Sequence, residues 1–210
     1  MNKPVTPVKL RGRPREFDRD QALARAMRLF WSRGYEATSV SELTEAMGIT
    51  PPSLYSAFGD KKRLFLEAVD RYQEGPGAFA TKALAEEPTA ERAIRSLLMG
   101  AVDSFCDPKQ PRGCMVVLSA TNCAVESSDV LHDLADRRRA AERAIRDRIV
   151  AGRAAGEFPA DTDADALAGL VTATLYGIAL KARDGASRNS LRRIVDQTIR
   201  MWPRAEPTGR

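Results

Sequence analysis

Few side chains in this sequence have the type and spacing needed for covalent or metal chemistry. Cys114 follows Gly113 at the start of an expected helix, where the helix dipole would lower the pKa of a thiol and favour its reaction with oxidants or electrophiles. Cys106 and Cys123 could then form a disulfide with it, although the simpler explanation of Cys114 is a small buried residue that begins a helix. The one histidine, His132, has no partner at metal-ligand spacing, and we expect it on the surface.

No nucleophile motif and no glycine-rich phosphate loop occurs in the sequence. The sequence therefore predicts no catalytic residue, no metal and no cofactor. A thiol oxidoreductase that acts through Cys114 is the best enzymatic alternative.

A second group of residues has spacing that suits binding. Thr50 is expected to cap a short helix, and Pro51 follows at the first helical position, where a missing N–H has no cost. Leu54 and Phe58 lie four residues apart and are expected to point inward. The outer surface is then left with small or hydrogen-bonding side chains: Pro52, Ser53, Tyr55 and Ser56. Because the start of a helix attracts phosphate, this surface suits DNA, although a plain helical bundle with a polar face has the same spacing.

Other helices must hold this short helix in place. Asp18 and Gln21 predict a capping box for a helix over about residues 18–33, and Gly34 would end it. Asp60 is expected to cap another helix after the short one.

The helix directly before the short one completes a recognisable unit. Thr38 or Ser39 would cap it, with Glu42 as the capping-box partner of Ser39, and Gly48 would end it in a tight turn. Two short helices joined around a glycine are typical of a helix-turn-helix, here over about residues 38–57.

Residues 15–72 resemble the DNA-binding domain of TetR-family transcriptional regulators. That family has an aromatic residue and a Gly-aromatic pair at the end of its first helix, a Thr-Ser-Val type opening of the second, a Gly-Ile-Thr type turn, and a lysine that opens the fourth. The matching residues are Phe30, Gly34, Tyr35, Thr38, Ser39, Val40, Gly48, Ile49, Thr50, Leu54, Tyr55, Phe58 and Lys61. Thr44 and Met47 depart from the usual alanines, and we expect them to alter helix packing more than function.

The resemblance implies a role for each of these exposed positions. Phosphate contacts are expected from Thr38, Ser39, Tyr55 and Lys61. Base contacts are expected from Thr50, Pro51, Pro52, Ser53 and Ser56. The Pro51-Pro52 pair offers apolar contact, for example to thymine methyl groups, and few donors. Much of the affinity should therefore come from phosphates.

The net charge of +5 is unevenly placed along the chain. Five of the 33 basic residues precede the first acidic residue, Glu16, and the remaining basic residues equal the 28 acidic ones in number. Gly12-Arg13-Pro14-Arg15 resembles an arm found in some TetR-family members, and Arg13 is expected to enter a narrow minor groove. A solubilising tail is the alternative explanation.

The remainder of the chain has no motif of similar specificity and is expected to be helical. Proline and glycine predict a loop over residues 107–113. The predicted fold is all-α, with about nine helices. Helices are expected over residues 89–105 and 114–125, from a cap at Ser128 or Asp129 toward Gly156, from residues 161–163 to about 183, and over 187–202. The predicted domains are a flexible basic arm (1–14), a DNA-binding domain (15–75), a ligand-binding and dimerisation domain (76–203) and a disordered tail (204–210).

Two stripes near the C-terminus predict a homodimer. Gly169, Ala173 and Gly177 lie four residues apart, so another helix could approach them closely. A second stripe consists of Leu191, Ile194, Val195, Thr198 and Trp202. Two helices from each subunit would form the family's usual four-helix interface, although both stripes could instead pack within one chain. A dimer would place two recognition helices about one DNA turn apart and implies a palindromic operator.

The resemblance also implies a pocket for an unknown small-molecule effector among the middle helices. The candidate lining residues are Leu98, Met99, Val102, Phe105, Met115, Leu118, Asn122, Thr172 and Tyr176. Asn122 and Tyr176 are the strongest candidates, because a polar group on an apolar face needs a partner. Arg112-Gly113-Cys114 resembles a segment in a branch of the family that includes thiol-based sensors, so redox or electrophile sensing through Cys114 is an alternative. The run Arg137-Arg138-Arg139 is expected to be a solvated helix face.

Together these patterns predict a homodimeric transcriptional regulator, most simply a repressor, that binds double-stranded operator DNA. A ligand would displace the DNA-binding domain through the fourth helix. No apolar run approaches a membrane span and the start lacks the core of a signal peptide, so we expect a cytoplasmic protein without a membrane partner. A helical protein that binds other proteins and not DNA is the distant alternative.

Overall fold

The structure is a computed structural model that describes residues 17–204. Arg13, the basic arm and the tail after Arg204 lie outside the described residues. Within them the chain forms ten α-helices and one short 3-10 helix, and no strand. The helices are α1 (Arg19–Arg33), α2 (Val40–Met47), α3 (Pro51–Phe58), α4 (Lys61–Glu74), α5 (Phe79–Glu86), α6 (Ala90–Phe105), α7 (Met115–Leu118), α8 (Ser128–Ala154), α9 (Ala164–Arg183) and α10 (Arg188–Arg200), with the 3-10 helix η1 (Val125–Ser127) before α8.

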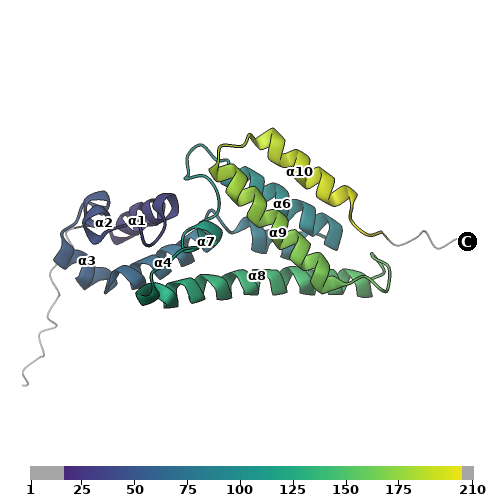
Figure 1. Ribbon diagram of the computed structural model, residues 1–210, viewed down its shortest axis with the longest axis horizontal. Coiled ribbons are helices and arrows are strands. Elements are labelled where there is room, and N and C mark those ends of the chain that lie inside the picture. Colours follow the sequence, from purple (N-terminus) through teal and green to yellow (C-terminus); the bar gives the residue numbers. More distant parts are fainter. Residues whose placement is uncertain (1–16, 205–210) are drawn as a thin grey trace, which may run out of the picture.

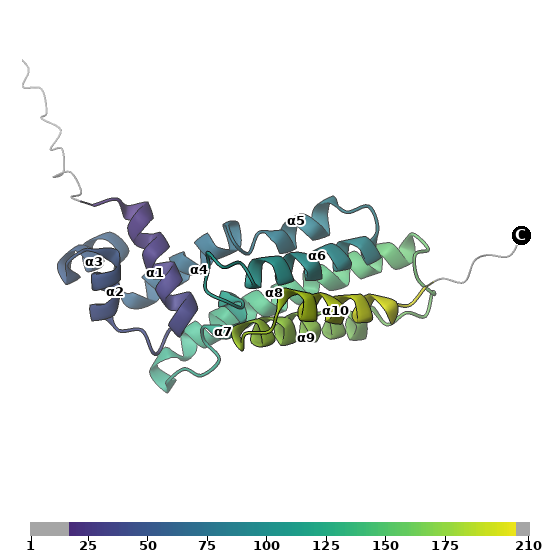
Figure 2. The ribbon, with the colours of Figure 1, turned by 90° about the horizontal axis from the view of Figure 1, so that it is seen from above.

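The helices form two units that meet along α4 and α7 (Figure 1). We call α1–α4, which the sequence predicts to bind DNA, the DNA-binding unit, and α5–α10, which it predicts to bind a ligand, the regulatory unit. The long α8 runs under the whole regulatory unit, and α6, α9 and α10 lie above it (Figures 1 and 2). The all-α prediction is confirmed.

Local capping sets the limits of the first four helices. The Asp18 carboxylate accepts hydrogen bonds from the N–H groups of Asp20 and Gln21 at the start of α1. Ser39 and Glu42 form the predicted capping box at the start of α2. Because these bonds satisfy N–H groups that the helix itself leaves free, each cap fixes a helix start within one residue of the prediction.

An aromatic cluster gives the DNA-binding unit its core. Phe30 and Trp31 from α1 are fully buried. The rings of Phe30 and Phe65 meet edge to face with centroids 5.0 Å apart, and Tyr35 also lies 5.0 Å from Phe65. These contacts hold α1, α4 and the α1–α2 turn together, so that α2 and α3 rest on a rigid base.

The predicted helix over residues 114–125 is wrong, because α7 ends at Leu118. The carbonyl of Ser119 accepts a hydrogen bond from the N–H of Tyr35 at 2.7 Å, so a partner from the DNA-binding unit replaces a continued helical bond. α5 was not predicted at all, since its cap position Ala78 makes no side-chain hydrogen bond. α8 begins at Ser128, directly after η1. Ser127, at its cap position, makes no side-chain hydrogen bond to the helix start.

α9 is long and apolar enough to cross a membrane by length and composition alone, with a mean hydropathy of 1.2. In the structure it packs against α6, α8 and α10. The buried side of α9 is therefore part of the core of the regulatory unit.

Candidate nucleic-acid interface and internal pocket

α3 presents a polar and uncharged surface to solvent. Leu54 and Phe58 are buried against the unit, as their spacing predicted. Among the described residues, no hydrogen bond occupies the hydroxyl groups of Tyr55 and Ser56. The exposed residues of α3 are Pro51, Pro52, Tyr55 and Ser56. The exposed side of α3 can therefore offer hydroxyl groups and apolar proline rings to a nucleic acid.

The start of α3 has few free backbone donors. Pro51 and Pro52 have no N–H, and the N–H of Ser53 donates to Thr50 Oγ1 at 3.4 Å. The hydroxyl groups of Thr50 and Ser53 lie 3.0 Å apart and share a hydrogen bond. An anion at this helix start would thus find hydroxyl groups in place of the usual N–H groups.

The predicted phosphate contact from Thr38 is wrong. Its side chain is fully buried, and its hydroxyl donates to the carbonyl oxygen of Gly34 at 2.7 Å. Thr38 therefore stabilises the turn between α1 and α2. Ser39 is exposed, but its hydroxyl donates to the Glu42 carboxylate and accepts from the Glu42 N–H. In this structure its hydroxyl therefore caps α2.

Lys61 lies at the start of α4 beside the same surface. Its ammonium group stands 4.3 Å from the centre of the Tyr35 ring, a cation–π contact. Burial lowers the pKa of Lys61, and the nearby Glu36 carboxylate opposes that change. Among the described residues, Lys61 makes no ion pair, whereas its neighbours Lys62 and Arg63 pair with Asp129 and Asp60. Its charge is therefore available to a phosphate.

One apolar face of the regulatory unit remains open. Leu170 and Leu180 on α9 are 44% and 53% exposed, and Met201 after α10 is 61% exposed. Side chains added at Gly169 or Gly177 would meet no atom within 4 Å. We call this surface the α9–α10 face: Ala166, Gly169, Leu170, Ala173, Gly177, Leu180, Ile194 and Met201.

The predicted dimer stripe of the last helix is wrong in four of its five residues. Leu191, Val195, Thr198 and Trp202 are buried within the chain. The Trp202 ring meets Phe158 edge to face at 6.0 Å. These residues face α6 and α9 because that side of α10 carries its largest apolar groups. Only Ile194 of that stripe remains partly exposed.

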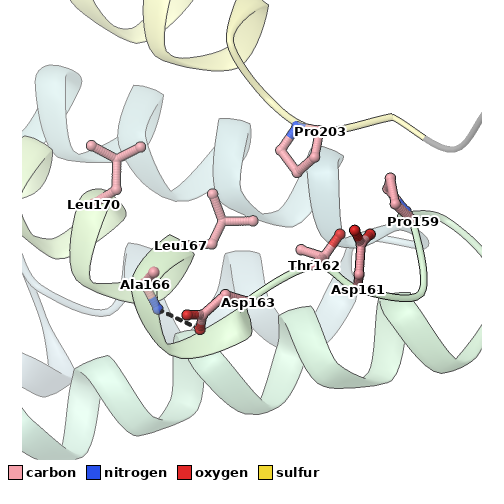
Figure 3. A pocket seen from close by; sticks show the side chains of 8 residues that line it. All are labelled: Pro159, Asp161, Thr162, Asp163, Ala166, Leu167, Leu170 and Pro203. Carbon is pink, nitrogen blue, oxygen red and sulfur yellow. Dashed lines mark hydrogen bonds between the residues drawn. The ribbon is translucent and has the colours of Figure 1, made fainter.

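A shallow hollow lies beside this face at the end of the molecule farthest from α3 (Figure 3). Its volume is about 430 Å³, and its walls include Thr162, Leu167, Leu170 and Pro203. The Asp163 carboxylate in its wall caps α9 by accepting from the N–H groups of Asp165 and Ala166. Asp163 thus has a structural role.

A smaller and more enclosed pocket lies where the two units meet. Its volume is about 90 Å³, and residues of α4, α5, α6, α7, α8 and α9 line it. Phe105, Thr172 and Tyr176, three of the residues predicted to line an effector pocket, line this cavity. The walls are mostly apolar, with further contributions from Tyr72, Phe79, Ala80, Cys114, Val116, Val117 and Leu175.

Four other predicted pocket residues do not line it. Asn122 is exposed in the turns after α7, because that helix ends four residues earlier. Val102 is fully buried in the core. Met99 and Leu118 are partly buried and pack against the core from elsewhere. The two remaining candidates, Leu98 and Met115, are fully buried core residues as well.

The α8 side of the pocket carries charge that the sequence did not reveal. Arg138 lines the pocket and donates to the carbonyl oxygen of Val116 at 2.9 Å. Thr172 Oγ1 donates to the Glu142 carboxylate at 3.2 Å. The predicted solvated arginine face is thus wrong for Arg138 and for Arg137, which binds Asp70 and Asp133 at 2.6 Å each. Arg137 and Arg138 could be identified only from the burial of one side of α8, which the local sequence pattern does not show.

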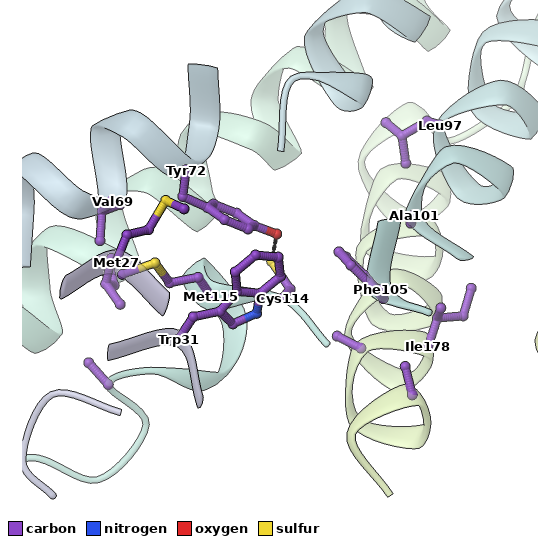
Figure 4. Close-up of a cluster of buried hydrophobic side chains, with 14 of the residues drawn as sticks. Met27, Trp31, Val69, Tyr72, Leu97, Ala101, Phe105, Cys114, Met115 and Ile178 are labelled. Carbon is purple, nitrogen blue, oxygen red and sulfur yellow. Dashed lines mark hydrogen bonds between the residues drawn. The ribbon is translucent and has the colours of Figure 1, made fainter. Parts of the chain in front are cut away.

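Cys114 lies at the junction of the pocket and the DNA-binding unit (Figure 4). The Tyr72 hydroxyl donates to its sulfur at 3.4 Å, and the Tyr72 ring stacks edge to face on Trp31 at 4.7 Å. Burial raises the pKa of Cys114, so the predicted lowering is wrong: α7 has only four residues, and the sulfur is enclosed. Cys106, Cys114 and Cys123 are free thiols.

Comparison with known proteins agrees with both units. The sequence model described as "Bacterial regulatory proteins, tetR family" matches residues 22–68, and that described as "Tetracyclin repressor-like, C-terminal domain" matches residues 90–198. The HTH-type transcriptional repressor ComR of Escherichia coli K12 is 37% identical over 199 residues, 93% of each chain. The repressor BdcR of the same strain is 30% identical over 86% of each chain.

A solved structure resembles the whole molecule. A cysteine mutant of the TetR-family regulator CifR, in complex with a 26-bp double-strand operator DNA, has a TM-score of 0.88 at 43% identity. The match covers 91% of this chain and 100% of that one.

Proposed function

Because this chain belongs to the TetR family of bacterial transcriptional regulators, we propose that it is a repressor that binds a palindromic operator as a homodimer and leaves it when a small molecule occupies the regulatory unit. The chain is a regulator and not an enzyme, as the sequence predicted. Its place of action is then the bacterial cytoplasm, where its DNA is.

The exposed surface of α3 is the observation that carries the DNA-binding part of the proposal. Tyr55 and Ser56 offer unoccupied hydroxyl groups, and Pro51 and Pro52 offer apolar rings, on a helix whose other face is fixed in the core. α3 has no charged side chain, so the phosphate contacts fall to flanking groups such as Lys61. Such an interface gives base contacts of modest strength and affinity that depends on salt.

The α9–α10 face supports a homodimer. Apolar side chains such as Leu170 and Leu180 remain exposed beside the glycines of α9, at which a second helix could pack closely. A two-fold axis through this face would present two copies of α3 to one side of a DNA duplex. That arrangement matches a palindromic operator.

The internal pocket supports a small and largely apolar effector. Its volume of about 90 Å³ is below the ~150 Å³ of a cavity that holds benzene, so any larger ligand requires lining side chains to move. Tyr72 belongs to α4 and Thr172 to α9, so a ligand between them would press on both units. Ligand binding and DNA binding would then oppose each other reciprocally.

The proposal is tested by fluorescence anisotropy with DNA from immediately upstream of the protein's own gene. Scrambled DNA of the same length serves as the reference, at two salt concentrations. We expect tight binding to the native fragment only, weakened by salt. The double variant Tyr55→Phe/Ser56→Ala should lose that preference. The matched control Tyr176→Phe, in the regulatory unit, should keep it. Equal binding of both fragments at both salt concentrations would contradict the local operator.

A second candidate is a regulator that senses electrophiles or oxidants through Cys114. Its sulfur lines the pocket and accepts a hydrogen bond from Tyr72, so a small reagent that enters the pocket would meet it. Burial raises the pKa of this thiol and so lowers its reactivity at neutral pH. Mass spectrometry after treatment with iodoacetamide tests the idea, with Cys114→Ser as control. Modification of Cys123 but not of Cys114 would count against it.

A further inference from the structure

One side chain connects the end of α9 to the end of α1. Arg183, the last residue of α9, donates through Nη2 to the carbonyl oxygen of Trp31 at 2.8 Å and through Nη1 to that of Ser32 at 3.2 Å. Its Nε donates to the carbonyl oxygen of Arg112 at 2.9 Å. Trp31 and Ser32 belong to the last turn of α1, whose carbonyls have no partner within the helix and carry the negative end of its dipole. A guanidinium group matches them in charge and in geometry.

Arg183 differs from the arginines that connect helices through ion pairs. Arg19 and Arg137 pair with carboxylates, whereas no carboxylate lies within 4 Å of Arg183 among residues 17–204. Burial lowers the pKa of Arg183. The three carbonyl contacts are therefore the interactions that offset the desolvation of its charge.

Neighbouring groups make this contact a rigid joint. Trp31 Nε1 donates to the carbonyl oxygen of Gly113 at 3.0 Å, and Arg112 Nε donates to that of Ala182 in α9 at 2.7 Å. Gly113 has a φ of +85°, and a Cβ there would lie only 2.9 Å from the carbonyl oxygen of Ala179. We call Trp31, Arg112, Gly113 and Arg183 the α1–α9 joint.

The joint lies on the helix that carries the other functional surfaces of the regulatory unit. α9 contributes Leu170 and Leu180 to the α9–α10 face and Thr172 and Tyr176 to the pocket. In a dimer built on that face, each DNA-binding unit would be held directly by the helix at the two-fold axis. This contact is additional to the connection through α4.

We propose that Arg183 is a positioning residue for operator binding: by attaching α1 to the end of α9, it fixes the separation and orientation of the two DNA-binding units in the dimer. This inference rests on the proposed function, because it requires a homodimer on a palindromic operator. Arg183 itself does not contact DNA. Its loss should therefore impair recognition of two half-sites at once and leave recognition of one half-site intact.

The test compares operator duplexes that differ only in geometry. Anisotropy is measured with the native palindrome, with the same duplex carrying one scrambled half-site, and with duplexes in which one base pair is inserted or deleted between the half-sites. The proteins are the wild type, Arg183→Met, Arg183→Lys and the matched control Arg153→Met. Arg153 is also half-buried, and it donates to the carbonyl oxygen of Thr162 at the opposite end of the regulatory unit. Thermal melting confirms that each variant is folded.

We expect the wild type to bind the native spacing at least about tenfold more tightly than the altered spacings. Arg183→Met should reduce that preference to about threefold or less, while its affinity for the half-site duplex stays within about twofold of the wild type. Arg183→Lys keeps the charge and one donor and should be intermediate, and Arg153→Met should match the wild type. If Arg183→Met does not fold, the Lys variant carries the test.

Three results would overturn the inference. One is an unchanged spacing preference in both Arg183 variants. Another is an equal loss of affinity for half-site and full-site DNA, which would show a purely structural role. A wild type without preference for the palindrome would overturn the proposed function and this inference together, whereas the first two results leave the proposed function intact.

Discussion

α3 and α9 each bury one face and expose the other, but they expose opposite kinds of chemistry. α3 turns Leu54 and Phe58 inward and presents Tyr55, Ser56 and two prolines. α9 turns Val171 and Ile178 inward and still presents Leu170 and Leu180. Hydroxyl groups remain hydrated when a partner leaves, whereas exposed leucines are stabilised by a permanent dry contact.

For the homodimer proposed above, the difference indicates which contact is reversible. A regulator must release DNA, so a neutral and polar α3 with help from nearby cations suits an interaction that ligand and salt can modulate. A dimer that must hold two such helices in register benefits from an apolar interface that does not dissociate. Four predictions, in order of decreasing effect, test this contrast.

The largest effect is expected from a charge on the α9–α10 face. Leu170→Glu should convert the dimer to a monomer and lower affinity for the full operator by about 100-fold, because two linked half-site contacts become one. Analytical ultracentrifugation and anisotropy measure the two effects. Val125→Glu is the control, since Val125 is 85% exposed and lies outside this face. If the Leu170→Glu protein were still a dimer, the proposal that α9 forms the interface would be wrong.

The next effect concerns the contact between the two units. Gly34 has a φ of +85° and a ψ of 170°, and a Cβ there would lie 3.1 Å from the carbonyl oxygen of Ser119. Gly34→Ala should lower the free energy of unfolding by about 1–3 kcal/mol, because this backbone region is accessible almost only to glycine. Urea denaturation measures it. Gly156→Ala is the comparison variant, matched in φ (+77°) and with no atom within 4 Å of the added Cβ. If both variants lose the same free energy of unfolding, the effect comes from backbone strain, and the contact with Ser119 contributes nothing.

A smaller effect is expected on α3. Tyr55→Phe removes one exposed hydroxyl without altering the core, because Leu54 and Phe58 hold the helix. We expect the affinity for a single half-site to fall about five- to tenfold, the loss of one hydrogen bond of about 1 kcal/mol per DNA-binding unit, with an unchanged melting temperature. Unchanged affinity would show that the ring and not the hydroxyl of Tyr55 meets the DNA.

The smallest effect is a pH dependence at the cap of α2. Hydrogen bonds from the N–H and hydroxyl of Ser39 lower the pKa of Glu42. Its contribution to stability is therefore present above its ordinary pKa and is lost as the pH falls through the lowered value in the folded state. When the pH is lowered from 6 to 3, the melting temperature should fall slightly more for the wild type than for Glu42→Gln. The amide of the variant keeps one capping hydrogen bond and does not titrate. Parallel melting curves would contradict this role.

Local signals predicted the DNA-binding unit well for a physical reason. Asp18, Ser39, Thr50 and Asp60 each satisfy N–H groups within three residues of their own position, so the caps of α1–α4 depend on little beyond the local sequence. The regulatory unit has such caps at Thr89, Asp163 and Ser187, and those helix starts were predicted as well. α5, α7 and α8 have no side-chain cap, and there the prediction missed the helix, its end and its cap residue, respectively.

The sequence by itself thus determined the class of protein and most helix limits, and it predicts α3 as the recognition helix. Only the tertiary structure decided which side of each helix is covered. It turned Thr38 toward Gly34, ended α7 at a bond between Tyr35 and Ser119, and buried Leu191 and Trp202 within the chain. It also brought Arg138 and Cys114 to the pocket and Arg183 to the end of α1. Caps and periodicity act over a few residues, whereas the rotation of a helix about its axis depends on the neighbours that pack against it.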